Sequence, residues 1–334
     1  MLVENPLGSR MLLSCLDRCP TCNSPEAMVR QLRSVARAVY AETLTLQFAT
    51  RWLFATLCGT TTHAPPSTPT CRTMTPIDRL DLMLNDMASA DPLFRPTNFW
   101  DTGLVAIVDD LRAQGFDNFR AHKSALEMYV PTYASSAYRN NPASIHRLAK
   151  LIRGLARNDR VADLLLDDHV GKLQAQRDYL VFQAASRQAS EPHLHDLSES
   201  EAGQPFEQHT FEERRFSRSF LNYLRGMAFL KQHADTSRLN SALEIGGGFG
   251  TAGEILLKAR PRAVYVNVDI PPVAAVSTYY LKQALGDETV LGYEATRELE
   301  TIDISRLPDG VRAVILCPWQ LPRLVGEFDL FINF

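Results

Sequence analysis

Leu243-Glu-Ile-Gly-Gly-Gly-Phe-Gly250 is the stretch that decides the fold of this 334-residue chain. Ser241-Ala-Leu-Glu-Ile245 indicates a short buried strand, the glycines that follow indicate a sharp turn, and residues 251–258 indicate a helix. Such a turn lets the backbone approach a ligand closely, beside the free N–H groups at the start of the helix. The stretch therefore predicts a nucleotide-type binding site.

Further strands alternate with helices on the C-terminal side of this turn. Strands are expected at residues 263–268, 311–316 and 328–332, and a second helix at residues 273–285. Strands that alternate with helices form a parallel sheet. We therefore expect residues 236–334 to form a partial Rossmann-like α/β domain, with about four parallel strands.

The sequence before residue 236 has a different character. Apolar residues recur at helical spacing within residues 77–87, 104–111, 145–155 and 212–232, which predicts a mostly helical region over residues 74–235. Residues 59–72 are rich in Pro and Thr and indicate a linker. We expect residues 1–73 to be an N-terminal appendage with little ordered structure.

Composition excludes several classes of protein. Apolar residues make up 45% of the chain and charged residues 22%, which is typical of a globular protein. The net charge of −3 does not favour nucleic-acid binding. No run reaches the roughly 18 apolar residues of a membrane span, and no signal peptide is recognisable. A cytoplasmic protein is therefore expected.

Three cysteines, Cys15, Cys19 and Cys22, form the pattern C-x3-C-x2-C near the N-terminus. The spacing matches that of radical enzymes that hold an iron–sulfur cluster, but the aromatic residue that usually accompanies it is missing. A zinc site would need a fourth ligand nearby, and none lies at metal-ligand spacing. We interpret the cysteines as a chance cluster and predict no metal.

Two motifs compete for the glycine turn. Residues 248–253 match G-x-G-x-x-G, the dinucleotide fingerprint, whereas residues 244–250 match E-x-G-x-G-x-G, the first motif of S-adenosylmethionine-dependent methyltransferases. Glu244 favours the second motif, because its carboxylate suits a cationic cofactor and would repel a pyrophosphate. A turn that opened at Gly248 would also extend the strand through Gly246 and Gly247, which are poor strand residues.

Asp269 lies at the predicted end of the second strand, where its carboxylate could accept hydrogen bonds from both ribose hydroxyls. Both S-adenosylmethionine and NAD contain a ribose, so this residue does not separate the two cofactors. The favoured interpretation is a methyltransferase. An NAD-dependent oxidoreductase and a non-catalytic remnant or binding module stay open as alternatives.

The chain also resembles the sugar O-methyltransferase family. The resemblance rests on Leu243-Glu-Ile-Gly-Gly-Gly-Phe-Gly250, Tyr265-Val-Asn-Val-Asp-Ile-Pro-Pro272, Ser277-Thr-Tyr-Tyr-Leu281, Cys317-Pro-Trp-Gln320 and Phe328-Asp-Leu-Phe-Ile-Asn333. It implies a Rossmann-like methyltransferase domain behind a helical N-terminal region. The implied activity is methyl transfer from S-adenosyl-L-methionine to a hydroxyl of a sugar or glycan.

Seven cofactor-binding residues follow from the resemblance: Glu244, Gly246, Gly248, Gly250, Asp269, Trp319 and Gln320. The three glycines would line the methionine part of the cofactor, with Glu244 near its ammonium group. Asp269 would hold the ribose, and Trp319 and Gln320 would lie against the adenine. Ser219 and Tyr223 are weaker candidates for a cofactor or substrate contact.

The catalytic residues are not predicted. Transfer to an alcohol needs a base that accepts the hydroxyl proton. The candidate histidines are His122, His193, His195, His209 and His233. None has a stronger case than the others.

Members of the resembled family continue past the position of Asn333 with strands and helices that close the sheet. The resemblance therefore predicts that this chain is truncated, with an unpaired sheet edge and an apolar face with little to cover it. Such a chain would bind the cofactor poorly or be inactive.

Overall fold

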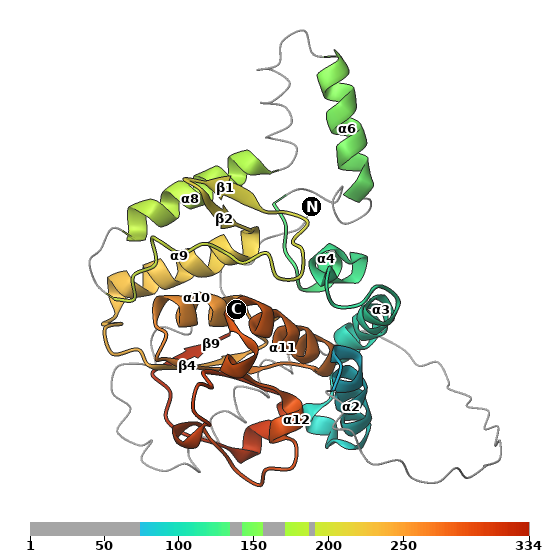
Figure 1. Ribbon diagram of the computed structural model, residues 1–334, viewed down its shortest axis with the longest axis vertical. Helices are drawn as coiled ribbons and strands as arrows, with labels where there is room; N and C mark the ends of the chain where they lie inside the picture. Colours follow the sequence, from blue (N-terminus) through green and yellow to red (C-terminus); the bar gives the residue numbers. More distant parts are fainter. Residues whose placement is uncertain (1–73, 134–141, 156–170, 187–190, 334) are drawn as a thin grey trace, which may run out of the picture. The chain divides into compact units, whose positions relative to one another are not determined.

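The structure is a computed structural model that describes residues 74–133, 142–155, 171–186 and 191–333 (Figure 1). The chain divides into two units by its contacts, and every described residue belongs to the second unit, Thr70–Phe334. The predicted appendage at residues 1–73 and its three cysteines therefore lie outside the described residues.

A parallel sheet is the centre of the second unit. Its strand order is β5-β7-β4-β3-β9, and every neighbouring pair is parallel. The strands are β3 (Ser241–Ile245), β4 (Val264–Val268), β5 (Val290–Leu291), β7 (Ala313–Leu316) and β9 (Leu330–Ile332). The predicted α/β class and its four parallel strands are confirmed, and the two-residue strand β5 adds a fifth.

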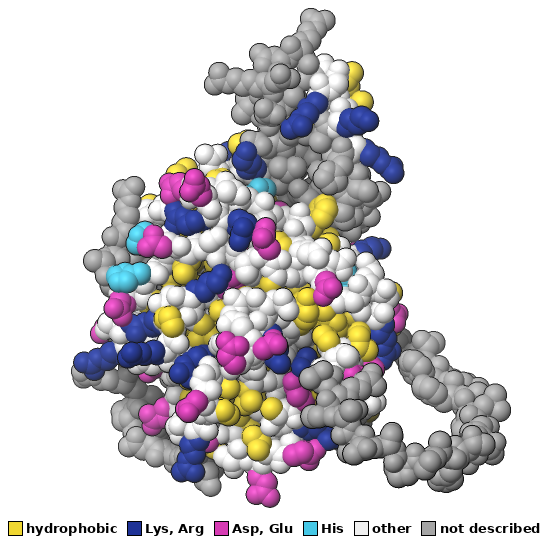
Figure 2. Space-filling model, in the orientation of Figure 1, with side chains coloured by type: hydrophobic (Ala, Val, Ile, Leu, Met, Phe, Trp, Pro, Cys, Tyr) yellow, Lys and Arg dark blue, Asp and Glu magenta, His cyan; other side chains and the backbone are white. Residues whose placement is uncertain are grey.

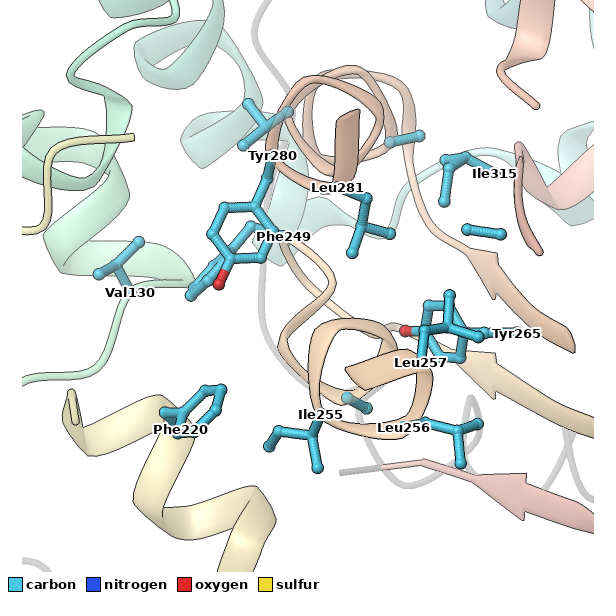
Figure 3. Close-up of a cluster of buried hydrophobic side chains, with 14 of the residues drawn as sticks. Val130, Phe220, Phe249, Ile255, Leu256, Leu257, Tyr265, Tyr280, Leu281 and Ile315 are labelled. Atoms are coloured by element: carbon cyan, nitrogen blue, oxygen red, sulfur yellow. The ribbon is translucent and has the colours of Figure 1, made fainter. Parts of the chain in front are cut away.

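Helices α10 (Thr251–Ala259) and α11 (Pro271–Leu285) cover one face of this sheet (Figure 1). Their apolar side chains pack with those that point to this face from the strands. Figure 3 shows Leu257 of α10 beside Tyr265 of β4, and Leu281 of α11 beside Phe249 of the glycine turn. The two helices are the predicted ones, and each begins directly after a strand and its turn.

The opposite face of the sheet carries Leu243, Val266, Val268, Val314 and Leu316, all buried. Ile302 of β6 (Ile302–Asp303) and Val311 are buried in the same cluster, and Leu324 of β8 (Leu324–Val325) packs against it. Residues from the C-terminal loops thus cover this face, contrary to the expectation of an apolar face with little cover. Within the described strands, β9 pairs with β3 alone and forms one edge of the sheet.

Helices dominate the described residues before β3, as predicted. They are α2 (Pro76–Ser89), α3 (Asn98–Gln114), α4 (Lys123–Met128), α6 (Pro142–Leu155), α8 (Lys172–Ser186) and α9 (Arg218–His233). Helix α2 packs against α11, and α9 packs against both α8 and α10. One cluster of buried side chains extends from Leu80 in α2 to Ile332 in β9, so α2, α3, α4, α8 and α9 share a core with the sheet. Of the α6 side chains that the structure describes, none belongs to this cluster.

The predicted helix over residues 212–232 is wrong at its start. Residues 209–216 form a hairpin of β1 (His209–Phe211) and β2 (Arg214–Phe216). Glu212 and Glu213 form its turn with φ of 48° and 64°. Helix α9 begins only after Ser217, whose hydroxyl accepts the N–H of Phe220 at 3.2 Å and caps the helix. Phe216 therefore belongs to strand β2, although its distance in sequence from the apolar residues of α9 matches helical spacing.

Charged side chains of both signs are interspersed over the face shown in Figure 2, which matches the near balance in the composition. Among the described helices, none combines the length and the apolar character needed to cross a bilayer.

Candidate functional site

The glycine turn follows β3 directly. The strand ends at Ile245, and Gly246, Gly248 and Gly250 have φ of 75°, 58° and 99°, which other residues rarely adopt. The N–H of Gly250 donates to the Gly247 carbonyl oxygen at 3.1 Å, and α10 begins at the next residue. The strand does not continue through the first two glycines, so the turn opens at Gly246.

The two sides of this turn differ. A Cβ atom on Gly246 or Gly248 would meet no other heavy atom within 4 Å. A Cβ on Gly247 would lie 2.6 Å from both Glu244 Oε2 and Asn267 Oδ1. Gly246 and Gly248 therefore border open space, while Gly247 lies against buried polar groups.

The position of the turn in the sheet also favours a ligand. From β3 the chain proceeds to β4 and β7 on one side, and β9 lies on the other side. In open α/β sheets, ligands bind outside the carboxyl ends of the strands at this switch in strand order. The glycine turn lies at the carboxyl end of β3, and Asn333, just after β9, donates to the Ile245 carbonyl oxygen at 3.0 Å.

Asp269 follows β4 and bonds to the turn. Its Oδ2 accepts the N–H of Gly248 at 2.9 Å, and its Oδ1 accepts the N–H of Ile270 at 2.8 Å. Burial raises the pKa of Asp269 to about 7, although both N–H bonds favour the carboxylate, and the nearby Glu244 carboxyl adds to the rise. Each oxygen has a further lone pair with which it could accept a ribose hydroxyl.

Glu244 is fully buried behind the turn. Its Oε1 accepts the Tyr223 hydroxyl at 2.7 Å, and its Oε2 accepts the Tyr265 hydroxyl. Burial raises the pKa of Glu244, while the two hydroxyl bonds oppose that rise. Because Gly247 separates it from the open side, Glu244 would act on a ligand through its charge and not by direct contact.

Trp319 and Gln320 differ in exposure, although they are adjacent in the sequence. Gln320 is fully buried: its Oε1 accepts the Cys317 N–H and its Nε2 donates to Thr296 Oγ1, both at 2.9 Å. Trp319 is partly exposed, and its Nε1 donates to the Tyr293 hydroxyl at 3.0 Å. Trp319 lines a cavity of about 280 Å³ together with Tyr293 and residues of α2.

The predicted cofactor residues thus form two groups. Glu244, the glycines and Asp269 meet at the turn, and Trp319 lies in the cavity beyond β7. The two groups lie at the carboxyl ends of neighbouring strands. The N–H of Asp269, just after β4, donates at 3.1 Å to the carbonyl oxygen of Leu316, which ends β7 three residues before Trp319. The side chain of Gln320 has its polar atoms engaged within the protein and faces no open space.

Three polar residues of the site were not predicted. Tyr265 and Asn267 lie on the same face of β4, and Asn267 is the register partner of Glu244 on β3. Their alternation along the strand is the signal that could have identified them. Tyr129, the residue after α4, lies near enough to Asp269 for the charge of that carboxylate, together with burial and Asp110, to raise its pKa.

None of the candidate histidines hydrogen-bonds to the glycine turn. His122 is buried and bonds to Asn118 at 3.0 Å, and burial lowers its pKa. His209 is buried with its Nε2 3.6 Å from Glu207 Oε1. His193 and His195 are exposed, as is His233, which packs on Phe229. Across the described residues, no three His, Cys, Asp or Glu side chains form a metal site.

Comparisons of the chain with models of known families, with curated proteins and with solved structures found no match. The α/β fold and its five-stranded parallel sheet are therefore drawn from the structure alone.

Proposed function

We propose that this protein is an S-adenosylmethionine-dependent O-methyltransferase that acts on a hydroxyl of a sugar or glycan. The observation that supports this most is the glycine turn, which is open at Gly246 and Gly248 and is flanked by Glu244 and Asp269. The acceptor class rests only on the family resemblance of the five sequence motifs.

The charges at the turn suit a cationic ligand. Neither Glu244 nor Asp269 forms an ion pair with a described Lys or Arg; their partners are tyrosine hydroxyls and backbone N–H groups. The positive charges of a sulfonium and an ammonium group would be attracted to these two carboxylates, whereas the negative charges of a pyrophosphate would be repelled by them. Open space beside Gly246 and Gly248 would admit the methionine part, and Asp269 would hold the ribose.

When bound, the cofactor would supply an electrophilic methyl group. The chain would have to hold the acceptor oxygen in line with that group, exclude water and provide a base for the hydroxyl proton. The turn and Asp269 account for binding and orientation. We assign no residue as the base.

An NAD-dependent oxidoreductase is the second candidate, because of Gly253. A Cβ on Gly253 would lie 2.5 Å from the Tyr265 ring, so this glycine permits close packing of α10 on β4, as the third glycine of the dinucleotide fingerprint does. Against this candidate, the turn opens at Gly246, two residues before the first glycine of that fingerprint.

Isothermal titration of the whole chain with S-adenosylhomocysteine and, in parallel, with NAD would test the proposal. We expect S-adenosylhomocysteine to bind and Asp269→Ala to weaken it by about 1–3 kcal/mol, as for a lost hydrogen bond to a charged group. The matched control is Asp235→Ala, because Asp235 is exposed and its hydrogen bonds are local ones to Ser237. Binding of NAD alone would replace the proposal with the second candidate, and binding of neither ligand would contradict both.

A further inference from the structure

A cavity of about 360 Å³ lies between α8 and α9, and no residue of the glycine turn lines it. The lining residues that matter here are Tyr133, Arg177, Asp178, Arg218, Asn222 and Arg225. Three of these six are arginines and one is acidic. The lining of the cavity is thus predominantly basic.

Among the described residues, a carboxylate neutralises only one of the three arginines. Asp178 Oδ1 accepts from Arg225 at 2.6 Å, and Asp178 Oδ2 accepts the Tyr133 hydroxyl at 2.7 Å, so both oxygens of the carboxylate are engaged. Among the described residues, no carboxylate lies within ion-pair distance of Arg177 or Arg218. The described lining of the cavity therefore includes two guanidinium groups that no described carboxylate compensates.

Arg218 is held in place at this wall. One of its terminal N–H groups donates to the Thr132 carbonyl oxygen at 2.6 Å, and its guanidinium carbon lies 5.9 Å from the centre of the Tyr133 ring. A guanidinium has five N–H donors in a planar fork that matches a phosphate or carboxylate. A guanidinium already oriented by the backbone and a ring loses little conformational freedom when an anion binds.

The cavity and the glycine site share helix α9. Arg218, Asn222 and Arg225 line the cavity at helical spacing, and on the adjacent face Ser219 Oγ lies 3.0 Å from Thr251 Oγ1 at the start of α10. Tyr223, four residues after Ser219, donates to Glu244 behind the turn. A ligand in the cavity would therefore contact α9 on one face, while the adjacent face of the same helix holds the residues that support the turn.

We propose that this cavity binds a phosphate monoester, namely the phosphate group of a phosphorylated sugar acceptor. A phosphate monoester carries a charge of about −1.5 to −2 at neutral pH, which matches the two uncompensated guanidinium groups better than a single carboxylate does. The amide of Asn222 can bond to hydroxyls next to the phosphate. The assignment of this ligand as the methyl acceptor rests on the proposed function, but the phosphate site itself does not.

The test is isothermal titration of the whole chain with glucose 1-phosphate, inorganic phosphate and glucose at constant ionic strength. We expect glucose 1-phosphate to bind at least tenfold more tightly than either other probe, and Arg177→Gln and Arg218→Gln each to weaken it about tenfold or more. Arg177 is exposed, so its variant should fold even if Arg218→Gln does not. Arg238→Gln, at an exposed arginine after α9, is the matched control and should bind as the wild type does.

Each alternative result has a defined meaning. Equal binding of glucose 1-phosphate and glucose, or wild-type binding by Arg177→Gln, would overturn the phosphate site. Equal binding of inorganic phosphate and its ester would overturn the assignment to a sugar acceptor. Phosphate binding that requires Arg177, in a chain that does not bind S-adenosylhomocysteine, would support the site and contradict the proposed function.

Discussion

Binding of S-adenosylhomocysteine should depend on pH through Asp269. Burial raises the pKa of this carboxyl to about 7 in the free protein. A ribose hydroxyl donates to a carboxylate, so a ligand that bonds to Asp269 binds the ionised form and must displace the proton from the protonated form. Affinity should therefore rise with pH and level off above the pKa.

The size of this effect follows from the pKa. If the ligand binds only the ionised form, affinity changes about tenfold per pH unit below pH 7, or about thirtyfold between about pH 5.5 and the plateau. Isothermal titration across this range, in buffers with different ionisation enthalpies, would give both the affinity and the number of protons released. Release should approach one proton per ligand below pH 7 and fall to zero above it.

Asp269→Asn is the control, because the amide keeps the size of the carboxyl and does not titrate. Its binding should be weaker at high pH and should lack the thirtyfold change, so any change that remains belongs to the ligand's own amino group. The same pH dependence in wild type and variant would refute the role of Asp269. Affinity that falls as pH rises through 7 would refute it as well.

Three further substitutions test the turn and its support. Gly248→Val should reduce S-adenosylhomocysteine binding more than tenfold, because a branched side chain is strained at φ of 58° and would occupy the open side; an unchanged circular dichroism spectrum would show that the fold persists. Glu244→Gln should weaken binding of S-adenosylmethionine, which carries a sulfonium charge, and leave binding of glucose 1-phosphate unchanged, and equal loss of both would indicate a general packing defect. Gly253→Ala should lower the free energy of unfolding by about 1–3 kcal/mol in urea titrations, since its methyl group would overlap the Tyr265 ring; wild-type stability would contradict the close packing of α10 on β4.

The central part of the fold could be predicted because its signals are local. Ser241–Ile245 is a short apolar strand followed by a run of glycines, and a run of glycines favours a turn whatever the surrounding fold. The acid Asp269 could be placed at the end of β4 for the same reason. Strand β5 could not, because two residues carry no periodicity and Val290–Leu291 becomes a strand only by pairing with β7.

The interior of the site depends on tertiary contacts that the sequence does not display. Tyr265 and Asn267 lie beside Glu244 because β3 and β4 pair in a particular parallel register. The side chain of Gln320 faces inward because Cys317 and Thr296 both bond to it, which no spacing along the chain predicts. The apolar spacing within residues 212–232 predicts a helix that includes Phe216, but Phe216 lies in β2 and continues the helical spacing by coincidence.

A crystal structure of the chain grown with S-adenosylhomocysteine would test the central claim most directly. The account predicts the ligand's amino-acid part against Gly246 and Gly248, and its ribose hydroxyls within about 3 Å of the Asp269 oxygens. Crystals with the ligand bound elsewhere, or a diphosphate from NAD bound against the same glycines, would contradict it.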